Sequence, residues 1–212
     1  MMWVILPVKH LRHGKSRLKQ VLSEEQRSRL SYLLLEDTIE TLSNSNHVQG
    51  VTIISCDMNV SKLAGEYQSQ FIMTDKDNGF SEDAMTAINS LGSEKLDKIA
   101  IIPADLPQLT ENDLELLDTL HDQGVSLCKA EKDGGTNALV FTPPLTMPLL
   151  FGPDSFNKHQ QAAKIAGLTL TVVQTTGMQR DIDREEDLNW LIEQSAGGKA
   201  WDYIREIYKQ TV

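Results

Sequence analysis

Ile99-Ala100-Ile101-Ile102-Pro103-Ala104-Asp105 is the stretch of the chain that most clearly decides the fold class. A continuous apolar run of this length, closed by proline, is typical of a strand that is buried on both faces, as in a parallel sheet. We therefore predict a strand over 98–104 in the interior of a sheet. The loop that follows this strand carries Asp105.

On both sides of this strand, short β-rich runs alternate with amphipathic helical stretches. Ser23-Glu24-Glu25-Gln26 is a capping-box pattern, and Thr110 is a second helix-capping residue. The alternation predicts one α/β domain over 1–212 with a mainly parallel central sheet and a helical tail from about 199 to 212. The other predicted strands are 3–8, 51–55, 71–73, 125–130, 137–141 and 168–173. The first predicted helix begins near 24. The other predicted helices cover 61–67, 81–91 (ended by Gly92-Ser93), 110–123, 157–166, 184–194 and 200–209.

Composition excludes several classes of function. The chain has 212 residues, 20 Lys plus Arg, 30 Asp plus Glu and a net charge of −10. An acidic chain lacks the broad basic surface that nucleic acids or anionic membranes require. No apolar run approaches the ~20 residues of a membrane span, and the N-terminus has no secretory pattern. Cys56 and Cys128 form no metal or redox motif, so we expect a reduced, cytoplasmic setting.

A basic loop follows the first predicted strand. It contains Lys9, Arg12, Lys15, Arg17 and Lys19 without a single acidic residue. Open α/β sheets bind ligands beyond the carboxyl ends of their strands, and ammonium and guanidinium groups there suit a triphosphate. The spacing is not that of a Walker A loop, and a solvated basic loop is the alternative.

Two acidic segments are candidates for metal binding. Asp105 stands on a proline-bounded loop at the same sheet edge, where it could hold a divalent cation or serve only as a turn residue. The cation is favoured because Thr110 already caps the next helix. Asp181 and Asp183 flank an apolar residue, so an extended backbone would point both carboxylates toward one Mg²⁺ site. Asp183 could also open a capping box for the helix that follows.

Two further segments could bind an anion. Gly134-Gly135-Thr136 combines backbone that an anion can approach with a hydroxyl, although a hairpin turn would explain it equally well. Gly152 and Ser155 precede a predicted helix, whose free N–H groups would attract a phosphate. Ser155 could instead be only an N-cap.

In this order along the chain, the segments resemble a known family. The motifs are VKxLxxxKSRL after the first strand, PADLP, GGTNAL, FGxxSFxxH and DIDxxEDL, and the similarity runs from about 4 to 191. They resemble the small guanylyltransferases of deazaflavin coenzyme F420 biosynthesis. This resemblance implies a single-domain, Rossmann-like, glycosyltransferase-A-like fold of the nucleotide-diphospho-sugar transferase type. It also implies GTP, Mg²⁺ and a phosphorylated three-carbon acid: 2-phospho-L-lactate, phosphoenolpyruvate or 3-phospho-D-glycerate.

The resemblance also implies roles for individual residues. Asp105, Asp181 and Asp183 match the metal-binding aspartates, and Lys15 and Asp105 are the predicted catalytic residues. The residues predicted to bind the nucleotide are Lys9, Lys15, Ser16, Arg17 and Asp105. Those predicted to bind the acid are Thr136, Gly152 and Ser155. The family often has Gly-Leu-Asn before its third helix, where this chain has Asn78-Gly79-Phe80, so guanine selectivity rests on the family alone.

Other functions remain open at this point. One alternative is a nucleotidyltransferase of the same fold that acts on molybdopterin or a sugar phosphate. Another is a non-catalytic nucleotide sensor, which would not need to keep three aspartates. We also expect no nucleic-acid or membrane partner, and the amphipathic tail from Ala200 to Tyr208 could form a homodimer contact.

Overall fold

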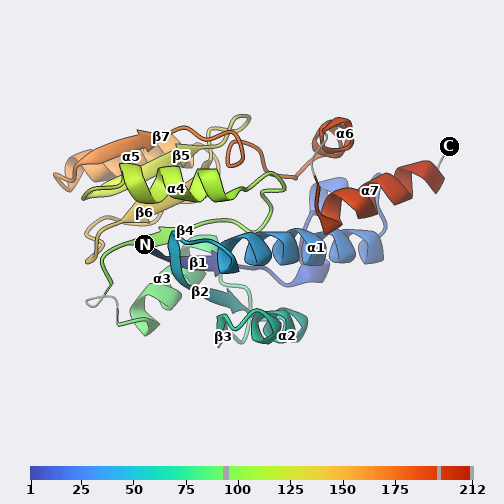
Figure 1. The fold of residues 1–212 in the computed structure, drawn as a ribbon, viewed down its shortest axis with the longest axis horizontal. Coiled ribbons are helices and arrows are strands. Elements are labelled where there is room, and N and C mark those ends of the chain that lie inside the picture. The colour runs from blue at the N-terminus through green and yellow to red at the C-terminus, as the bar shows by residue number, and fades with distance from the viewer. Residues whose placement is uncertain (93–95, 195–196, 211–212) are drawn as a thin grey trace.

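In the residues that the computed structural model describes, 1–92, 96–194 and 197–210, seven strands form one sheet in the order β3-β2-β1-β4-β6-β5-β7 (Figure 1). The strands are β1 (Met2–Pro7), β2 (Val48–Ser55), β3 (Gln70–Met73), β4 (Ile99–Ile101), β5 (Val125–Lys129), β6 (Thr136–Phe141) and β7 (Leu170–Val173). The helices are α1 (Glu24–Ser43), α2 (Met58–Glu66), α3 (Phe80–Ser90), α4 (Glu111–Leu120), α5 (Ser155–Ile165), α6 (Glu185–Glu193) and α7 (Lys199–Gln210).

Strand direction brings distant segments to one edge of the sheet. Strand β6 runs antiparallel to both of its neighbours, while the other paired strands are parallel to each other. The predicted mainly parallel sheet is therefore confirmed. Ile101, at the end of β4, pairs with Leu139 of the antiparallel β6. Strand β6 begins three residues earlier, at Thr136, so Thr136 lies beyond the carboxyl end of β4. Thr136 thus reaches the edge that carries Asp105.

Helices cover both faces of the sheet. Helices α1, α2 and α4 share one buried core with Val4 and Leu6, whereas α3 and α5 share the other core with Ile5. This division follows from the strand, in which neighbouring side chains point to opposite faces. Two cores around one sheet make the three-layer arrangement that α/β alternation predicts.

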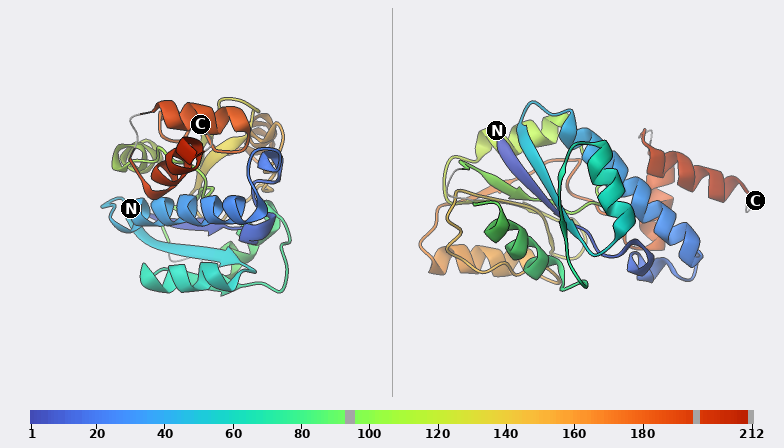
Figure 2. Two further views of the ribbon diagram at one scale, coloured as in Figure 1. Left: turned by 90° about the vertical axis from the view of Figure 1, so that its right-hand side faces the viewer. Right: turned by 90° about the horizontal axis from the view of Figure 1, so that it is seen from below.

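A third, smaller core lies beyond the end of the sheet. It joins α1, α6 and α7 to Leu18 in the basic loop and to Ile182 between the two aspartates. Figure 2 shows α6 and α7 projecting at that end of the molecule. The carboxylate of Asp37 on α1 accepts hydrogen bonds of 2.9 Å from the backbone N–H groups of Lys199 and Ala200. The apolar face of α7 is thus used within its own chain, and the homodimer stays a prediction.

Several element boundaries differ from the predicted ones. The helix predicted over 110–123 ends at Leu120, because His121 is extended and its buried ring contacts Ser126 and Thr142. The strand predicted over 98–104 is confined to β4, and the helix predicted from 157 begins at Ser155. Ser93 and residues 211–212 of the predicted tail lie outside the described residues.

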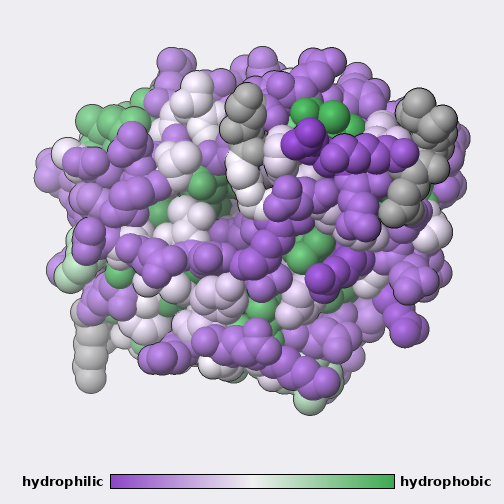
Figure 3. All heavy atoms as spheres, turned by 45° about the vertical axis from the view of Figure 1, so that its right-hand side comes forward, coloured by the Kyte–Doolittle hydropathy of each residue, from purple (hydrophilic) through white to green (hydrophobic). Residues whose placement is uncertain are grey.

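The visible face agrees with the hydrophilic composition. The face in Figure 3 is mainly hydrophilic, with apolar side chains scattered over it. Among the described helices, none combines the length and apolar character that crossing a membrane requires. The cytoplasmic setting stays an expectation.

Candidate active site

A cavity of about 570 Å³ opens at the edge of the sheet where β1 and β4 end. It gathers every residue that the sequence proposed for the site, although these come from five separate segments. The predicted residues that line the cavity are Lys9, Lys15, Ser16, Arg17, Asp105, Thr136, Gly152, Ser155, Asp181 and Asp183. The topology explains this, because β1 and β4 end at this edge and β6 begins there.

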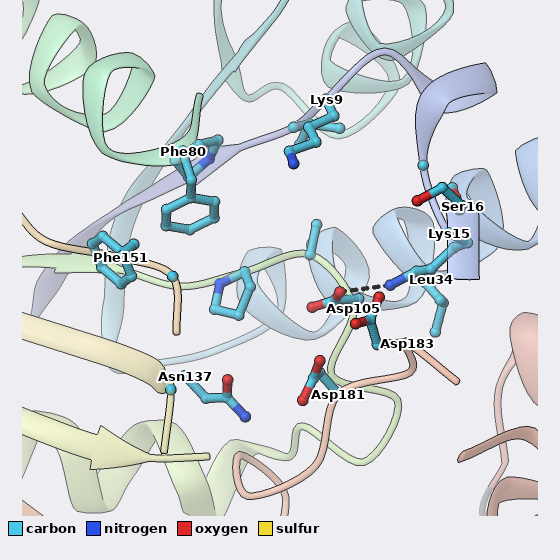
Figure 4. Close-up of a pocket in the computed structure, with 18 of the residues that line it drawn as sticks. Lys9, Lys15, Ser16, Leu34, Phe80, Asp105, Asn137, Phe151, Asp181 and Asp183 are labelled. Atoms are coloured by element: carbon cyan, nitrogen blue, oxygen red, sulfur yellow. Dashed lines mark hydrogen bonds and ion pairs between the residues drawn. The ribbon is translucent and has the colours of Figure 1, made fainter. Parts of the chain in front are cut away.

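Asp105 lies at the centre of the charged side of the cavity (Figure 4). Lys15 donates from Nζ to Asp105 Oδ2 at 2.6 Å, and the Lys15 side chain is only 8% exposed. The other carboxylate oxygen, Oδ1, is buried and has no hydrogen-bond partner among the described residues. The backbone N–H of Ile182 donates to the Asp105 carbonyl at 3.2 Å, which fixes the two acidic segments side by side.

Asp181 and Asp183 both line the cavity, while Ile182 between them is fully buried in the third core. The predicted alternation is therefore present. Asp183 forms an ion pair with Arg17. Its predicted capping role is wrong: Arg184 occupies the N-cap position of α6, and Asp187 accepts the backbone N–H groups of Arg184 and Asp183.

The aspartates repel one another in the absence of further cations. Burial, and then the negative charge of Asp105, raises the pKa of Asp181 to about 6, with Lys15 acting in the opposite direction. Within the described parts of the chain, no three His, Cys, Asp or Glu side chains make a ready metal-binding cluster. Lys15 and Arg17 instead neutralise Asp105 and Asp183. A set of carboxylate oxygens with one buried, unpaired oxygen fits a hard cation such as Mg²⁺.

Three cations of the basic loop line the cavity: Lys9, Lys15 and Arg17. Arg12 and Lys19 do not line it, and of the five only Lys15 is partly buried. The backbone of Lys15 is left-handed, with φ of 52°, between two short 3₁₀ turns, η1 (Leu11–His13) and η2 (Ser16–Leu18). The loop thus has a defined backbone, and its role in phosphate binding stays a prediction.

The opposite side of the cavity carries the predicted anion site, with two corrections. Ser155 is the first residue of α5, and Asp154, not Ser155, occupies the N-cap position. The backbone N–H of Ser155 donates to Gly152 O at 3.1 Å, and that of Phe156 donates to Gly134 O at 3.0 Å. The expectation that these N–H groups are free for a ligand is therefore wrong. The hydroxyls of Thr136 and Ser155 remain, 3.1 Å apart.

Several residues of the cavity wall had no role predicted from the sequence. Phe80 and Phe151 lie on the left in Figure 4, with ring centroids 4.6 Å apart. Asn137 lines the cavity while its Nδ2 donates to Met178 O at 2.8 Å. Beneath the hydroxyls lies His159, one helical turn after Ser155. His159 is the last residue of the FGxxSFxxH motif, and its i, i+4 spacing from Ser155 could also have linked it to the site.

Residues 2–211 match the family described as Guanylyl transferase CofC like. The chain belongs to this family. It is 36% identical over 206 residues to a phosphoenolpyruvate guanylyltransferase from Roseiflexus castenholzii, covering 97% of this chain and 94% of the relative. It is 31% identical over 207 residues to a 2-phospho-L-lactate guanylyltransferase from Methanothermobacter thermautotrophicus, covering 96% and 89%.

A solved structure shows the same fold. A protein from Desulfovibrio desulfuricans that is described as a putative nucleotide-diphospho-sugar transferase superimposes with a TM-score of 0.77 at 17% identity, covering 99% of this chain and 98% of that one. The predicted fold type and the prediction of a nucleotidyltransferase enzyme are confirmed. The roles assigned to individual residues of this guanylyl transferase family member stay predictions.

Proposed function

We propose that this chain moves GMP from GTP onto the phosphate of a small phosphorylated three-carbon acid and releases pyrophosphate, as a step in coenzyme F420 biosynthesis. The observation that carries this proposal is the two-sided cavity. One side holds carboxylates and the basic loop, and the other holds hydroxyls beside Asn137 and Phe151. Relatives named after phosphoenolpyruvate, 2-phospho-L-lactate and 3-phospho-D-glycerate support GTP and this class of acid as substrates.

The proposed chemistry is a phosphoryl substitution. An oxygen of the acid's phosphate attacks the α-phosphorus of GTP, a P–O–P bond forms, and the bond from the α-phosphorus to the β-phosphate oxygen breaks. A phosphomonoester has a second pKa of about 6, so its dianion is already a nucleophile at neutral pH and needs no general base. The main barrier is the mutual repulsion of two polyanions.

The side chains of the cavity are arranged to lower that barrier. Lys9, Lys15 and Arg17 place positive charge where the triphosphate would lie. We propose Asp105, Asp181 and Asp183 as ligands of Mg²⁺. When bound, this ion would supply charge neutralisation at the phosphates. The chain's own contribution is to hold the carboxylates together through the Ile182–Asp105 backbone bond and to orient both substrates.

A pyrophosphate-release assay tests the proposal. Each reaction contains GTP, Mg²⁺ and one acceptor: phosphoenolpyruvate, 2-phospho-L-lactate, 3-phospho-D-glycerate or a sugar phosphate. Control reactions leave out GTP, Mg²⁺ or the acceptor. We expect release only when GTP and one of the three acids are both present. Two outcomes would contradict the proposal: pyrophosphate release with GTP and the sugar phosphate but with none of the three acids, or rapid release from GTP without an acceptor.

Thr136→Val is expected to weaken binding of the acid without changing that of GTP. Valine keeps the shape but removes a hydroxyl that lines the cavity. A hydrogen bond to a charged group is worth ~1.5–3 kcal/mol, so the KM for the acid should rise by about 10- to 100-fold. Thr86→Val, on the exposed side of α3, is the matched control. An unchanged KM for the acid would remove Thr136 from the acid site.

A further inference from the structure

A buried chain of hydrogen bonds runs from the backbone to the anion side of the cavity. The backbone N–H of Leu150 donates to His159 Nε2 at 2.8 Å. His159 Nδ1 lies 3.0 Å from Thr136 Oγ1, and Ser155 Oγ donates to the same oxygen at 3.1 Å. His159 is fully buried, and Ser155 and Thr136 are nearly so, yet both hydroxyl residues line the cavity.

The Leu150 amide fixes the tautomer of His159. A backbone N–H can only donate, so Nε2 must carry a lone pair and the single proton of the neutral ring must be on Nδ1. Nδ1–H then donates to Thr136 Oγ1. Burial, and secondarily the charge of Lys158, lowers the pKa of His159 to about 4, so the ring stays neutral at physiological pH.

Counting protons shows what is left for a ligand. Nδ1, Thr136 and Ser155 provide three protons, and the two bonds among them use two. With Ser155 donating to Thr136, the Thr136 proton remains. If Thr136 donated to Ser155 instead, the Ser155 proton would remain. In both arrangements one hydroxyl proton has no acceptor within this chain of hydrogen bonds.

We infer that His159 is a positioning residue, which acts through Thr136 and Ser155 to present a hydroxyl donor to an anionic oxygen of the acid. This inference rests on the proposed function and adds a residue to its acid site. In the opposite tautomer the ring proton would be on Nε2, and Thr136 could donate to Nδ1 while Ser155 donates to Thr136. Both hydroxyl protons would then be used, and none would remain for a ligand. The donor matters because the N–H groups of Ser155 and Phe156 already bond within the chain.

A purely structural role is the competing explanation. His159 also holds the loop before Gly152 through the Leu150 bond, and its ring meets that of Phe151 edge-on at 4.9 Å. Two substitutions separate these roles. In His159→Asn, Nδ2 can replace Nδ1 and still donate to Thr136. In His159→Gln, Oε1 can replace Nε2 and still accept the Leu150 N–H.

The first test measures the tautomer of the unmodified protein. Long-range ¹H–¹⁵N NMR spectra distinguish protonated from unprotonated imidazole nitrogens. We expect Nδ1 to be protonated and Nε2 unprotonated for His159, with no change between about pH 5.5 and 8. An Nε2–H tautomer, or titration near pH 6.5, would overturn the inference whatever the substrate is.

The second test compares the two variants in steady-state kinetics. In His159→Gln, Thr136 and Ser155 keep their protons, but Thr136 Oγ1 loses the Nδ1–H donor that fixes the direction of the remaining one. We therefore expect His159→Gln to raise the KM for the acid at least about tenfold. His159→Asn should stay within about threefold of the unmodified protein, and calorimetric affinity for GTP should be unchanged in both. If His159→Asn were as defective as His159→Gln, or neither changed the KM, the positioning role would be wrong. If the unmodified protein showed no acid-dependent turnover, the proposed function would fail, while the NMR result would still decide the tautomer.

Discussion

Asp181→Asn is expected to lower guanylyl transfer by at least about 1,000-fold while making the metal-free protein more stable. The loss follows if the charge of Asp181 helps to hold Mg²⁺, because losing about 4 kcal/mol of transition-state stabilisation corresponds to a factor of about 1,000. The gain in stability follows from burial and from the charge of Asp105, which raise the pKa of Asp181 to about 6.

The pH dependence of that gain has a definite sign. The pKa of Asp181 is higher in the folded protein than the ~4 of an unfolded chain, so its ionised form opposes folding. This cost begins near pH 4 and is complete above about pH 6. Melting curves in metal-free buffer should therefore show Asp181→Asn more stable at pH 7.5, by at most about 3 kcal/mol for a pKa difference of about 2, and equal to the unmodified protein near pH 4.

Glu185→Gln provides the matched control, since it removes one negative charge from an exposed position at the start of α6. It should change neither activity nor the pH dependence of melting appreciably. Near-normal activity of Asp181→Asn at limiting Mg²⁺ would remove Asp181 from the proposed metal site. Lower stability at pH 7.5 would show that its charge is compensated in the metal-free protein.

Lys15→Met is expected to reduce kcat/KM for GTP by at least about 100-fold and, unlike Asp181→Asn, to destabilise the metal-free protein. Methionine retains a long apolar stem but removes the ammonium that the triphosphate would meet. It also leaves Asp105 without its 2.6 Å partner, facing Asp181. Removing one partner of a mostly buried ion pair leaves an uncompensated charge, so we expect a loss of ~1–3 kcal/mol that Mg²⁺ partly restores.

Lys19→Met in the same loop tests whether position matters more than net charge. Lys19 is exposed and follows the second 3₁₀ turn, so its replacement should leave kcat/KM for GTP within about twofold. Calorimetry with GTP and melting curves with and without Mg²⁺ measure both effects. Equal losses in the two variants would mean that the loop acts only through its total charge.

The sequence predicted which segments form strands and helices better than it predicted where those elements end. Periodicity marks where apolar side chains must face a core, and this located β4 and the loop that carries Asp105. Helix ends depend on long-range contacts that no local pattern contains. His121 stops α4 because its ring is held by Ser126 and Thr142, and α5 begins at Ser155 on a left-handed Asp154.

The candidate site was predictable where charge or a family motif marked it. Residue types alone could not show that Lys15 pairs with Asp105, because these residues meet only through the packing of β1 beside β4. The same holds for His159, whose link to Leu150 fixes a proton position that no motif encodes. The capping role considered for Asp183 failed because α6 begins one residue later: Arg184 is the N-cap, and Asp187 accepts the backbone N–H groups of Asp183 and Arg184.

The central claim is that GMP passes from GTP to the phosphate of the acid. Its most direct test follows the fate of each phosphorus atom of GTP, using ³²P in the α or the γ position and ³¹P NMR of the product. The account predicts that the α label appears in a P–O–P diester linked to the acid, in step with consumption of the acid, while the γ label appears only in pyrophosphate. Transfer of the γ label to the acid, or its release as inorganic phosphate without pyrophosphate, would contradict the account.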